Sequence, residues 1–271
     1  MNWLVEMISY PFMQRALIVG ILMSFCAALV GVTVVLKKNS MIGDGLSHVA
    51  FGAFAIASVL GLTPLWVALP IVILASFGSL FLSGRRKIDG DAIIAVLSAS
   101  GLAVGVLAIS AFRGVNIDLN SYLFGSILSV GWEDVVLSIV VALVVGIIYV
   151  VMYNRIFLVT FDAEFAKTLG LKTNIYDAVF AIICSVVIVL GMRLLGALLI
   201  SSLMIFPVLI AMTFNKSFKR VVIWSVVISV VNFLIGLLLS YFVSLPVGAT
   251  VVVVNLLILV IVRLARWGFR S

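Results

Sequence analysis

An aspartate and the only histidine of the chain, Asp44 and His48, lie four residues apart within GDGLSHVAF, residues 43–51. On a helix, residues at positions i and i+4 project from one face, with their Cβ atoms about 5–6 Å apart. A carboxylate and an imidazole suit divalent first-row metals, zinc and manganese among them. Ionisable side chains are costly inside an apolar span and commonly mark a pathway. Asp44 and His48 are therefore candidate metal ligands.

A structural interpretation of this pair stays open. Aspartate is a good N-cap, so Asp44 could begin a helix, and His48 could be a core histidine with satisfied nitrogens. If two copies of the chain met near this helix, a two-fold axis would bring two aspartates and two histidines together. Four such ligands are enough for tetrahedral zinc, or for part of an octahedral manganese site. The helix also carries a stripe of small residues suited to close packing in lipid: Ser47, Ala50, Ala53 and Ala57.

The chain around this pair has the composition of a polytopic helical membrane protein. Of its 271 residues, 65% are hydrophobic and 10% are charged, whereas soluble domains are roughly 45–50% apolar. A spanning helix needs about 20 residues, and the segment 114–131 is expected to be a re-entrant or interfacial helix. The apolar runs predict an all-α fold with about nine transmembrane helices (eight to ten) in a single domain, residues 1–271: 12–36, 44–61, 64–83, 92–112, 132–153, 174–191, 195–214, 220–243 and 247–265.

Lysine and arginine are distributed unevenly between the predicted connections. With nine spans, 14 of the 17 positive residues fall on one side of the membrane, and Arg15, Arg113 and Arg193 fall on the other. The positive-inside rule places the richer side in the cytoplasm, with the N-terminus outside and the C-terminus cytoplasmic. The net charge of +7 therefore reports topology, and no nucleic-acid partner is expected. Within the spans, Asn232 and Asn255 are expected to form interhelical hydrogen bonds.

The longest predicted cytoplasmic connection contains FDAEFAKTLG, residues 161–170, which predicts a short helix. Acidic residues come early, a lysine follows, and Gly170 is a stop signal. One face would be apolar, because large hydrophobic side chains recur every four residues: Phe161, Phe165 and Leu169. Such a helix could simply connect two spans, lie on the membrane surface, or dock into the groove of a soluble partner.

Several blocks of the sequence resemble the permease family of ATP-binding-cassette (ABC) importers for zinc, manganese and iron. MIGDGLSHVAFGAFAIA is similar to the family segment GDALSHAALPGVALA, and DLNSYLFGSIL (118–128) resembles a second block. One departure is Phe51, which stands where family members often have proline; it changes local helix bending and leaves the ligands in place. The matching positions of the first block are Gly43, Asp44, Ser47, His48 and Gly52. A third block, LLGALLISSLMIFPVLIA (194–211), matches at Gly196, Leu199 and Pro207.

The cytoplasmic EFAKTLG resembles the E-A-A-x-x-x-G loop of these permeases, matched by Glu164, Ala166 and Gly170. In the family, this loop is the coupling helix that docks on the ATPase. The resemblance thus implies an ABC metal-importer permease in a bacterial plasma membrane, with a coupling helix around 161–170. Two copies would form the path, a cytoplasmic ATPase dimer would bind them, and an extracytoplasmic metal-binding protein would deliver the ion. Asp44 and His48 match the family's candidate metal-coordinating residues.

The chain is not expected to be an enzyme, because the sequence contains no Walker A, GxSxG or HExxH motif. The ATPase would be a separate chain. Zn²⁺ or Mn²⁺ would be the transported substrate, with no permanently bound cofactor. The alternative is a carrier driven by an ion gradient, which would transport metal without any ATPase.

Overall fold

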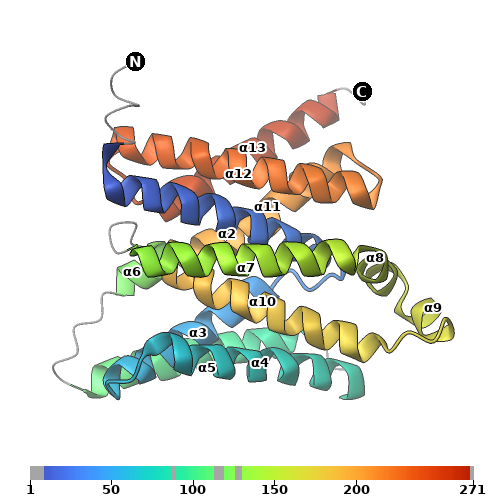
Figure 1. The fold of residues 1–271 in the computed structure, drawn as a ribbon, viewed down its shortest axis with the longest axis horizontal. Helices are drawn as coiled ribbons and strands as arrows, with labels where there is room; N and C mark the ends of the chain where they lie inside the picture. Colours follow the sequence, from blue (N-terminus) through green and yellow to red (C-terminus); the bar gives the residue numbers. More distant parts are fainter. Residues whose placement is uncertain (1–8, 87–89, 113–118, 126–129, 269–271) are drawn as a thin grey trace.

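The computed structural model describes residues 9–86, 90–112, 119–125 and 130–268, and the regular elements within these ranges are helices (Figure 1). Eight of the described helices are long and apolar enough to cross a membrane, and α4 adds a further apolar stretch, Pro64–Ser79. The prediction of an all-α polytopic membrane protein with about nine spanning helices is confirmed. The long helices are α2 (Pro11–Leu36), α3 (Ile42–Val59), α4 (Pro64–Arg86), α5 (Gly90–Ala111), α7 (Trp132–Val151), α10 (Thr173–Leu195), α11 (Ala197–Phe214), α12 (Phe218–Val243) and α13 (Val247–Gly268).

Three short helices complete the described structure: α6 (Leu119–Phe124), α8 (Tyr153–Phe161) and α9 (Ala163–Thr168). Helix α6 lies in the segment 114–131, predicted to be re-entrant or interfacial, of which residues 114–118 and 126–129 are outside the described ranges. It packs against α10, α11 and α13. This cover matters, because backbone that is not part of a spanning helix needs protein around it at membrane depth.

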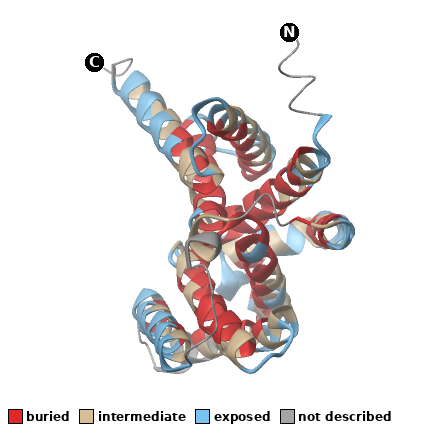
Figure 2. Ribbon diagram, turned by 90° about the vertical axis from the view of Figure 1, so that its left-hand side faces the viewer, coloured by how far each residue is buried: buried red, intermediate tan, exposed pale blue. Residues whose placement is uncertain are grey.

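Helix α2 occupies the centre of the bundle and contacts α7, α10, α11 and α12. Buried residues fill this centre, and exposed residues lie on the outward faces of the surrounding helices (Figure 2). A Cβ atom on Gly31 would lie 2.0 Å from the carbonyl oxygen of Met204, so α2 and α11 touch backbone to backbone. Lipid offers no hydrophobic drive for helix association, and close van der Waals packing at a small residue such as Gly31 replaces it.

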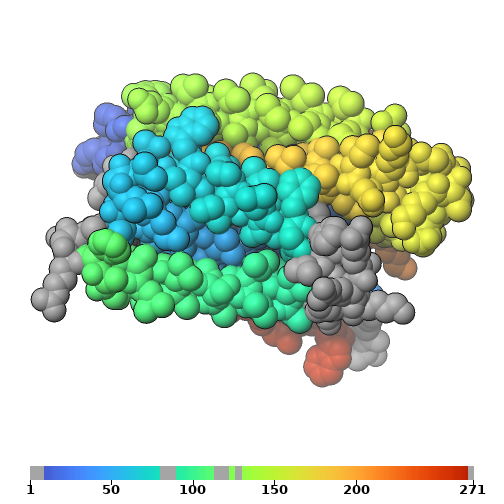
Figure 3. All heavy atoms as spheres, turned by 90° about the horizontal axis from the view of Figure 1, so that it is seen from below, coloured from blue at the N-terminus to red at the C-terminus, as the bar shows by residue number. Residues whose placement is uncertain are grey.

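Helix α3 packs against α4, α5, α10 and α11. From below, it lies in the hollow between α4 and α5 (Figure 3). A Cβ on Gly52 would lie 2.4 Å from the carbonyl oxygen of Gly101, so α3 and α5 also meet at their backbones. The small-residue stripe is buried within the chain, at 0–2% exposure, and therefore serves packing inside this subunit: Ser47, Ala50, Ala53 and Ala57.

The boundary between the sixth and seventh spans differs from the prediction, which ended one at 191 and began the next at 195. Helix α10 continues to Leu195, and only Gly196, at φ 92° and ψ 155°, separates it from α11. Arg193, which the prediction placed between the two spans, lies inside α10 and is paired, 3.2 Å from Asp134 Oδ1 at the start of α7. The Asp134 carboxylate is nearly buried and also accepts a hydrogen bond from the Gly131 N–H. This pairing lets the helix run on through a charged residue.

Helices α12 and α13 are joined by the hydrogen bond expected from their asparagines. The Asn232 Nδ2 atom donates to Asn255 Oδ1 at 2.7 Å, and both residues are buried. Asn255 Nδ2 in turn donates to the Val251 carbonyl oxygen. The prediction of interhelical hydrogen bonding is confirmed.

Candidate functional site

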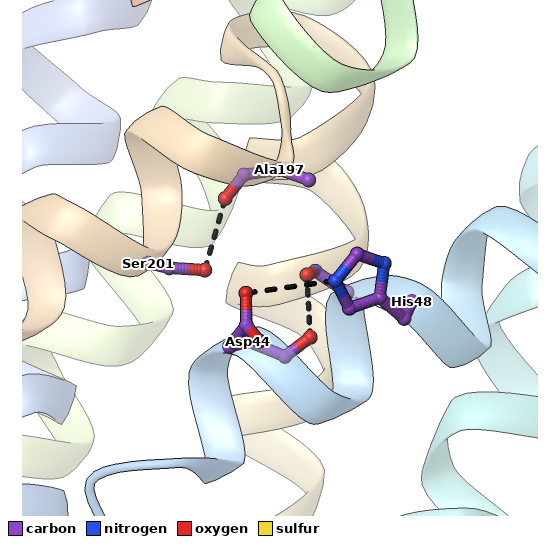
Figure 4. A network of polar contacts seen from close by, with 5 residues as sticks. Asp44, His48, Ala197 and Ser201 are labelled. Atoms are coloured by element: carbon purple, nitrogen blue, oxygen red, sulfur yellow. Dashed lines mark hydrogen bonds and ion pairs between the residues drawn. The ribbon is translucent and has the colours of Figure 1, made fainter. Parts of the chain in front are cut away.

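Asp44 and His48 lie in the first two turns of α3, and their side chains point to the same side of the helix (Figure 4). Asp44 Oδ1 and His48 Nε2 are 3.7 Å apart, and the two side chains are 42% and 21% exposed. Two ligands bound to one tetrahedral zinc ion at about 2.1 Å lie about 3.4 Å apart, so a shift of about 0.3 Å would let both bind one ion. The geometry therefore fits a shared cation on an accessible face.

Neither structural interpretation of the pair matches the geometry. The N-cap of α3 is Met41, and Asp44 is the third residue of the helix, so Asp44 does not occupy the cap position. The His48 Nδ1 atom is buried and finds no hydrogen-bond partner within the described ranges, so His48 is not a satisfied core histidine. The negative charge of Asp44 in the first turn is favourable next to the positive end of the helix dipole.

The pair lies between α11 on one side and α5 on the other. A Cβ on Gly43 would lie 3.8 Å from Ser201 Cα of α11, and a Cβ on Gly101 of α5 would lie 2.9 Å from the His48 carbonyl oxygen. Figure 4 shows the Ser201 side chain directed toward Asp44 and His48, with its hydroxyl donating to the Ala197 carbonyl oxygen at 2.9 Å. Ser201 was missed as a residue lining the site, because nothing in the sequence spacing links it to Asp44.

An aromatic cluster packs on α3 immediately beyond His48. Tyr122 of α6 stacks on Phe54 with ring centroids 5.5 Å apart, and it meets Phe51 edge to face at 6.2 Å. Phe51, the residue that departs from the family pattern, is thus buried against α6. Among the described residues no group of three or more His, Cys, Asp or Glu side chains is placed to hold a metal. Among these side-chain types, the described part of a single chain therefore contributes only Asp44 and His48 as metal ligands at this site.

The connection predicted to be cytoplasmic contains two short helices, α8 and α9, where the sequence pattern predicted a single helix with one apolar face from Phe161 onward. Asp162, at φ −148° and ψ 86°, breaks the chain direction, and its Oδ1 accepts a 2.8 Å hydrogen bond from the Phe165 N–H. This N-cap starts α9 at Ala163. Phe161 instead ends α8 and packs against Phe218, with ring centroids 5.9 Å apart. The prediction that Phe161 shares a face with Phe165 is wrong, because the capping aspartate separates them.

Helix α9 carries two of the residues that match the coupling loop, Glu164 and Ala166, and the third, Gly170, lies two residues beyond its end. Glu164 is exposed and pairs with Lys167 at 2.8 Å, and this hydrogen bond and charge raise the pKa of the Lys167 ammonium. Ala166 is fully buried. Gly170, at φ 80°, ends the helix, with its N–H donating to the Lys167 carbonyl oxygen at 2.9 Å. A left-handed residue at this position is a common helix stop and favours glycine. Phe165 remains exposed on α9, so the helix presents an apolar and acidic surface.

Comparisons with known proteins agree with this architecture. The ABC 3 transport family matches residues 9–266. The manganese import system permease protein ScaB of Streptococcus gordonii is 29% identical over 252 residues, which cover 93% of this chain and 90% of ScaB. The high-affinity zinc uptake system membrane protein ZnuB of Haemophilus influenzae is 27% identical over 252 residues, covering 93% of this chain and 97% of ZnuB.

Among solved structures, PsaBC from Streptococcus pneumoniae in complex with Fab has a similar fold. The TM-score is 0.85 at 26% sequence identity, over 96% of this chain and 94% of the matched chain. The nine long helices, the short α6 and the connection that contains α8 and α9 are thus parts of a known permease architecture. The chain belongs to the ABC 3 transport family, the membrane permeases of manganese, zinc and iron ABC importers.

Proposed function

We propose that the chain is the permease subunit of an ATP-driven zinc or manganese importer, and that Asp44 and His48 bind the ion during its passage. The observation that carries this proposal is the approach of the two ligand atoms to 3.7 Å on an accessible side of α3. Oxygen and nitrogen ligands accept both Zn²⁺ and Mn²⁺. The family relatives whose names specify a metal include one for manganese and one for zinc.

The path is formed by two copies of the chain, because one pair of ligands is too few for a dehydrated ion. Helix α5, which lies beside His48, is the least buried of the candidate spans. Its exposed face carries small residues near helical spacing, which would let a second helix approach closely: Ala92, Ala95, Ala99 and Ala103. A second copy would supply a second Asp44–His48 pair, and the two pairs together would complete a four-ligand site.

The site is suited to transport because its histidine is loosely held. In tight metal sites, the second ring nitrogen of a histidine ligand usually donates to a fixed acceptor. The buried Nδ1 of His48 has no such acceptor in the described part of the chain. A ligand without this support binds less tightly, which suits an ion that must leave the site again.

Energy enters through a cytoplasmic ATPase on a separate chain, which docks on α9. The exposed side of α9 offers Glu164 and Phe165 for this contact, and the turn at Gly170 sets where the helix ends. An extracytoplasmic metal-binding protein delivers the ion to the opposite side of the membrane. This arrangement has the N-terminus outside and the C-terminus in the cytoplasm, as the distribution of lysine and arginine predicts.

The deciding experiment is reconstitution of the permease with its ATPase and binding protein in liposomes, followed by competing uptake of zinc, manganese and iron. Asp44→Ala and His48→Ala should abolish uptake while the complex still assembles. Glu133→Gln, which removes a carboxylate at the start of α7, is the control and should transport normally. Normal uptake by both site variants would reject the assigned ligands. Uptake that needs no ATPase would favour the gradient-driven carrier.

The coupling role of α9 is tested in the same preparation. Glu164→Ala and Gly170→Ala should leave ATP hydrolysis in place while uptake falls, because the docking surface no longer transmits the change in the ATPase. An unchanged ratio of ions transported to ATP hydrolysed in both variants would reject the docking role.

A further inference from the structure

Lys37 and Asp177 form an ion pair between the ends of two spanning helices. Lys37 Nζ lies 2.5 Å from Asp177 Oδ1, and the side chains are only 20% and 31% exposed. The same ammonium group lies 5.9 Å from the ring centroid of Phe180, one turn further along α10. A short charge-assisted hydrogen bond and a cation–π contact thus hold this lysine against α10.

Lys37 is joined to the metal-site helix by a short and well-defined connection. It is the C-cap residue of α2, and α3 begins at Ile42. Between them, Lys38 adopts a left-handed conformation at φ 61°. The Asn39 N–H donates to the Val34 carbonyl oxygen, and the Ile42 N–H donates to the Asn39 carbonyl oxygen, both at 3.0 Å. A displacement of Lys37 is therefore passed to the first turn of α3, which carries the candidate ligand Asp44.

Asp177 is joined in the same way to the cytoplasmic loop. It is the fifth residue of α10, which starts at Thr173, and α9 ends at Thr168. The four residues between them are hydrogen-bonded: the Leu171 N–H donates to the Ala166 carbonyl oxygen at 3.1 Å, and the Thr173 N–H donates to the Leu171 carbonyl oxygen at 2.9 Å. Helix α9 also contacts α10 directly. A movement of α9 therefore displaces the start of α10.

We propose that the Lys37–Asp177 pair transmits movement of α9 to α3, so that both are positioning residues for transport and neither touches the ion. This inference rests on the proposed function, because it requires that the ATPase acts on α9. The order of contacts is α9, the start of α10, the ion pair, the connection from α2 to α3, and the helix that carries Asp44 and His48. Helix α10 also packs directly on α2 and α3, so breaking the pair leaves both binding surfaces and this apolar packing intact and removes only the charged link between the start of α10 and the connection to α3.

The test measures ions transported per ATP hydrolysed by the complete reconstituted complex. Lys37→Gln and Asp177→Asn should each lower this ratio about fivefold or more, the size of a typical coupling between sites. The double variant should lower this ratio no further than either single variant, because each substitution removes the same interaction. The charge swap Lys37→Asp/Asp177→Lys should recover part of the ratio, because it restores an ion pair. A merely structural role would lower uptake and ATP hydrolysis together and leave their ratio unchanged. Lys38→Gln, which removes the neighbouring exposed charge, is the control and should match the wild type.

The outcomes separate this inference from the proposed function. If wild-type complex transports metal with ATP and both single variants keep its ratio, the ion pair is not the link and the inference is overturned alone. Additive losses in the double variant would also overturn it, because the two residues would then act independently. If the wild-type complex shows no ATP-dependent uptake, the proposed function fails, and the inference fails with it.

Discussion

Substitution of Gly52 by alanine tests how closely the metal-site helix packs on α5. A Cβ at this position would lie 2.4 Å from the Gly101 carbonyl oxygen, whereas ordinary contact starts at 3.4 Å, so the two helices must separate by about 1 Å. The obstructing atom belongs to helical backbone, and no change of rotamer can relieve the clash. Overpacking of this kind costs about 1–3 kcal/mol. For a chain of this size, a loss of ~2 kcal/mol lowers the melting temperature by roughly 4–8 °C.

The assay heats the purified protein in detergent and measures its unfolding as the loss of the monodisperse peak in size-exclusion chromatography. Gly78→Ala is the matched control, because a Cβ at this helical position meets no described atom within 4 Å. Alanine also has the higher helix propensity, so the control should melt no lower than the wild type. If Gly52→Ala and Gly78→Ala melted at the same temperature, the backbone contact between α3 and α5 would be refuted.

Two further predictions follow from named contacts. Asn232→Leu should destabilise the protein by about 0.6–1.7 kcal/mol, because it removes the hydrogen bond to Asn255 within the membrane. The double variant Asn232→Leu/Asn255→Leu should melt closer to the wild type, since no buried amide is left without its partner. Additive losses of stability in the double variant would contradict this. Glu164→Gln should lower the pKa of Lys167, because the Glu164 hydrogen bond and charge are the main causes of its raised value. Because the pKa of Lys167 is raised, the pair contributes at neutral pH and its contribution is lost as the pH rises through the pKa of Lys167 in the folded protein. Carbon NMR of methylated lysines measures this titration, and an unchanged titration in Glu164→Gln would contradict the assignment.

The amino-acid sequence alone determined the spans and the candidate ligands, because both depend on local features. The length of an apolar run decides whether a helix can cross the bilayer, whatever its neighbours are. The spacing of Asp44 and His48 places both on one helix face without reference to the rest of the chain. The stop at Gly170 is local for the same reason. Helix capping is also local. The four-residue spacing of Phe161, Phe165 and Leu169 nevertheless predicted one continuous helix, whereas Asp162 ends α8 and begins α9.

Only the tertiary structure decided which helices meet and what surrounds the pair. The spans are all apolar, and lipid is as apolar as their side chains, so hydropathy does not say which face contacts which helix. The approach of α5 depends on glycines in two helices, Gly52 and Gly101, that are distant in the sequence. The same holds for Ser201 beside Asp44, and for the pairing of Arg193 with Asp134 that lets α10 run to Gly196. These contacts arise from shape and charge brought together by folding, and no local pattern encodes them.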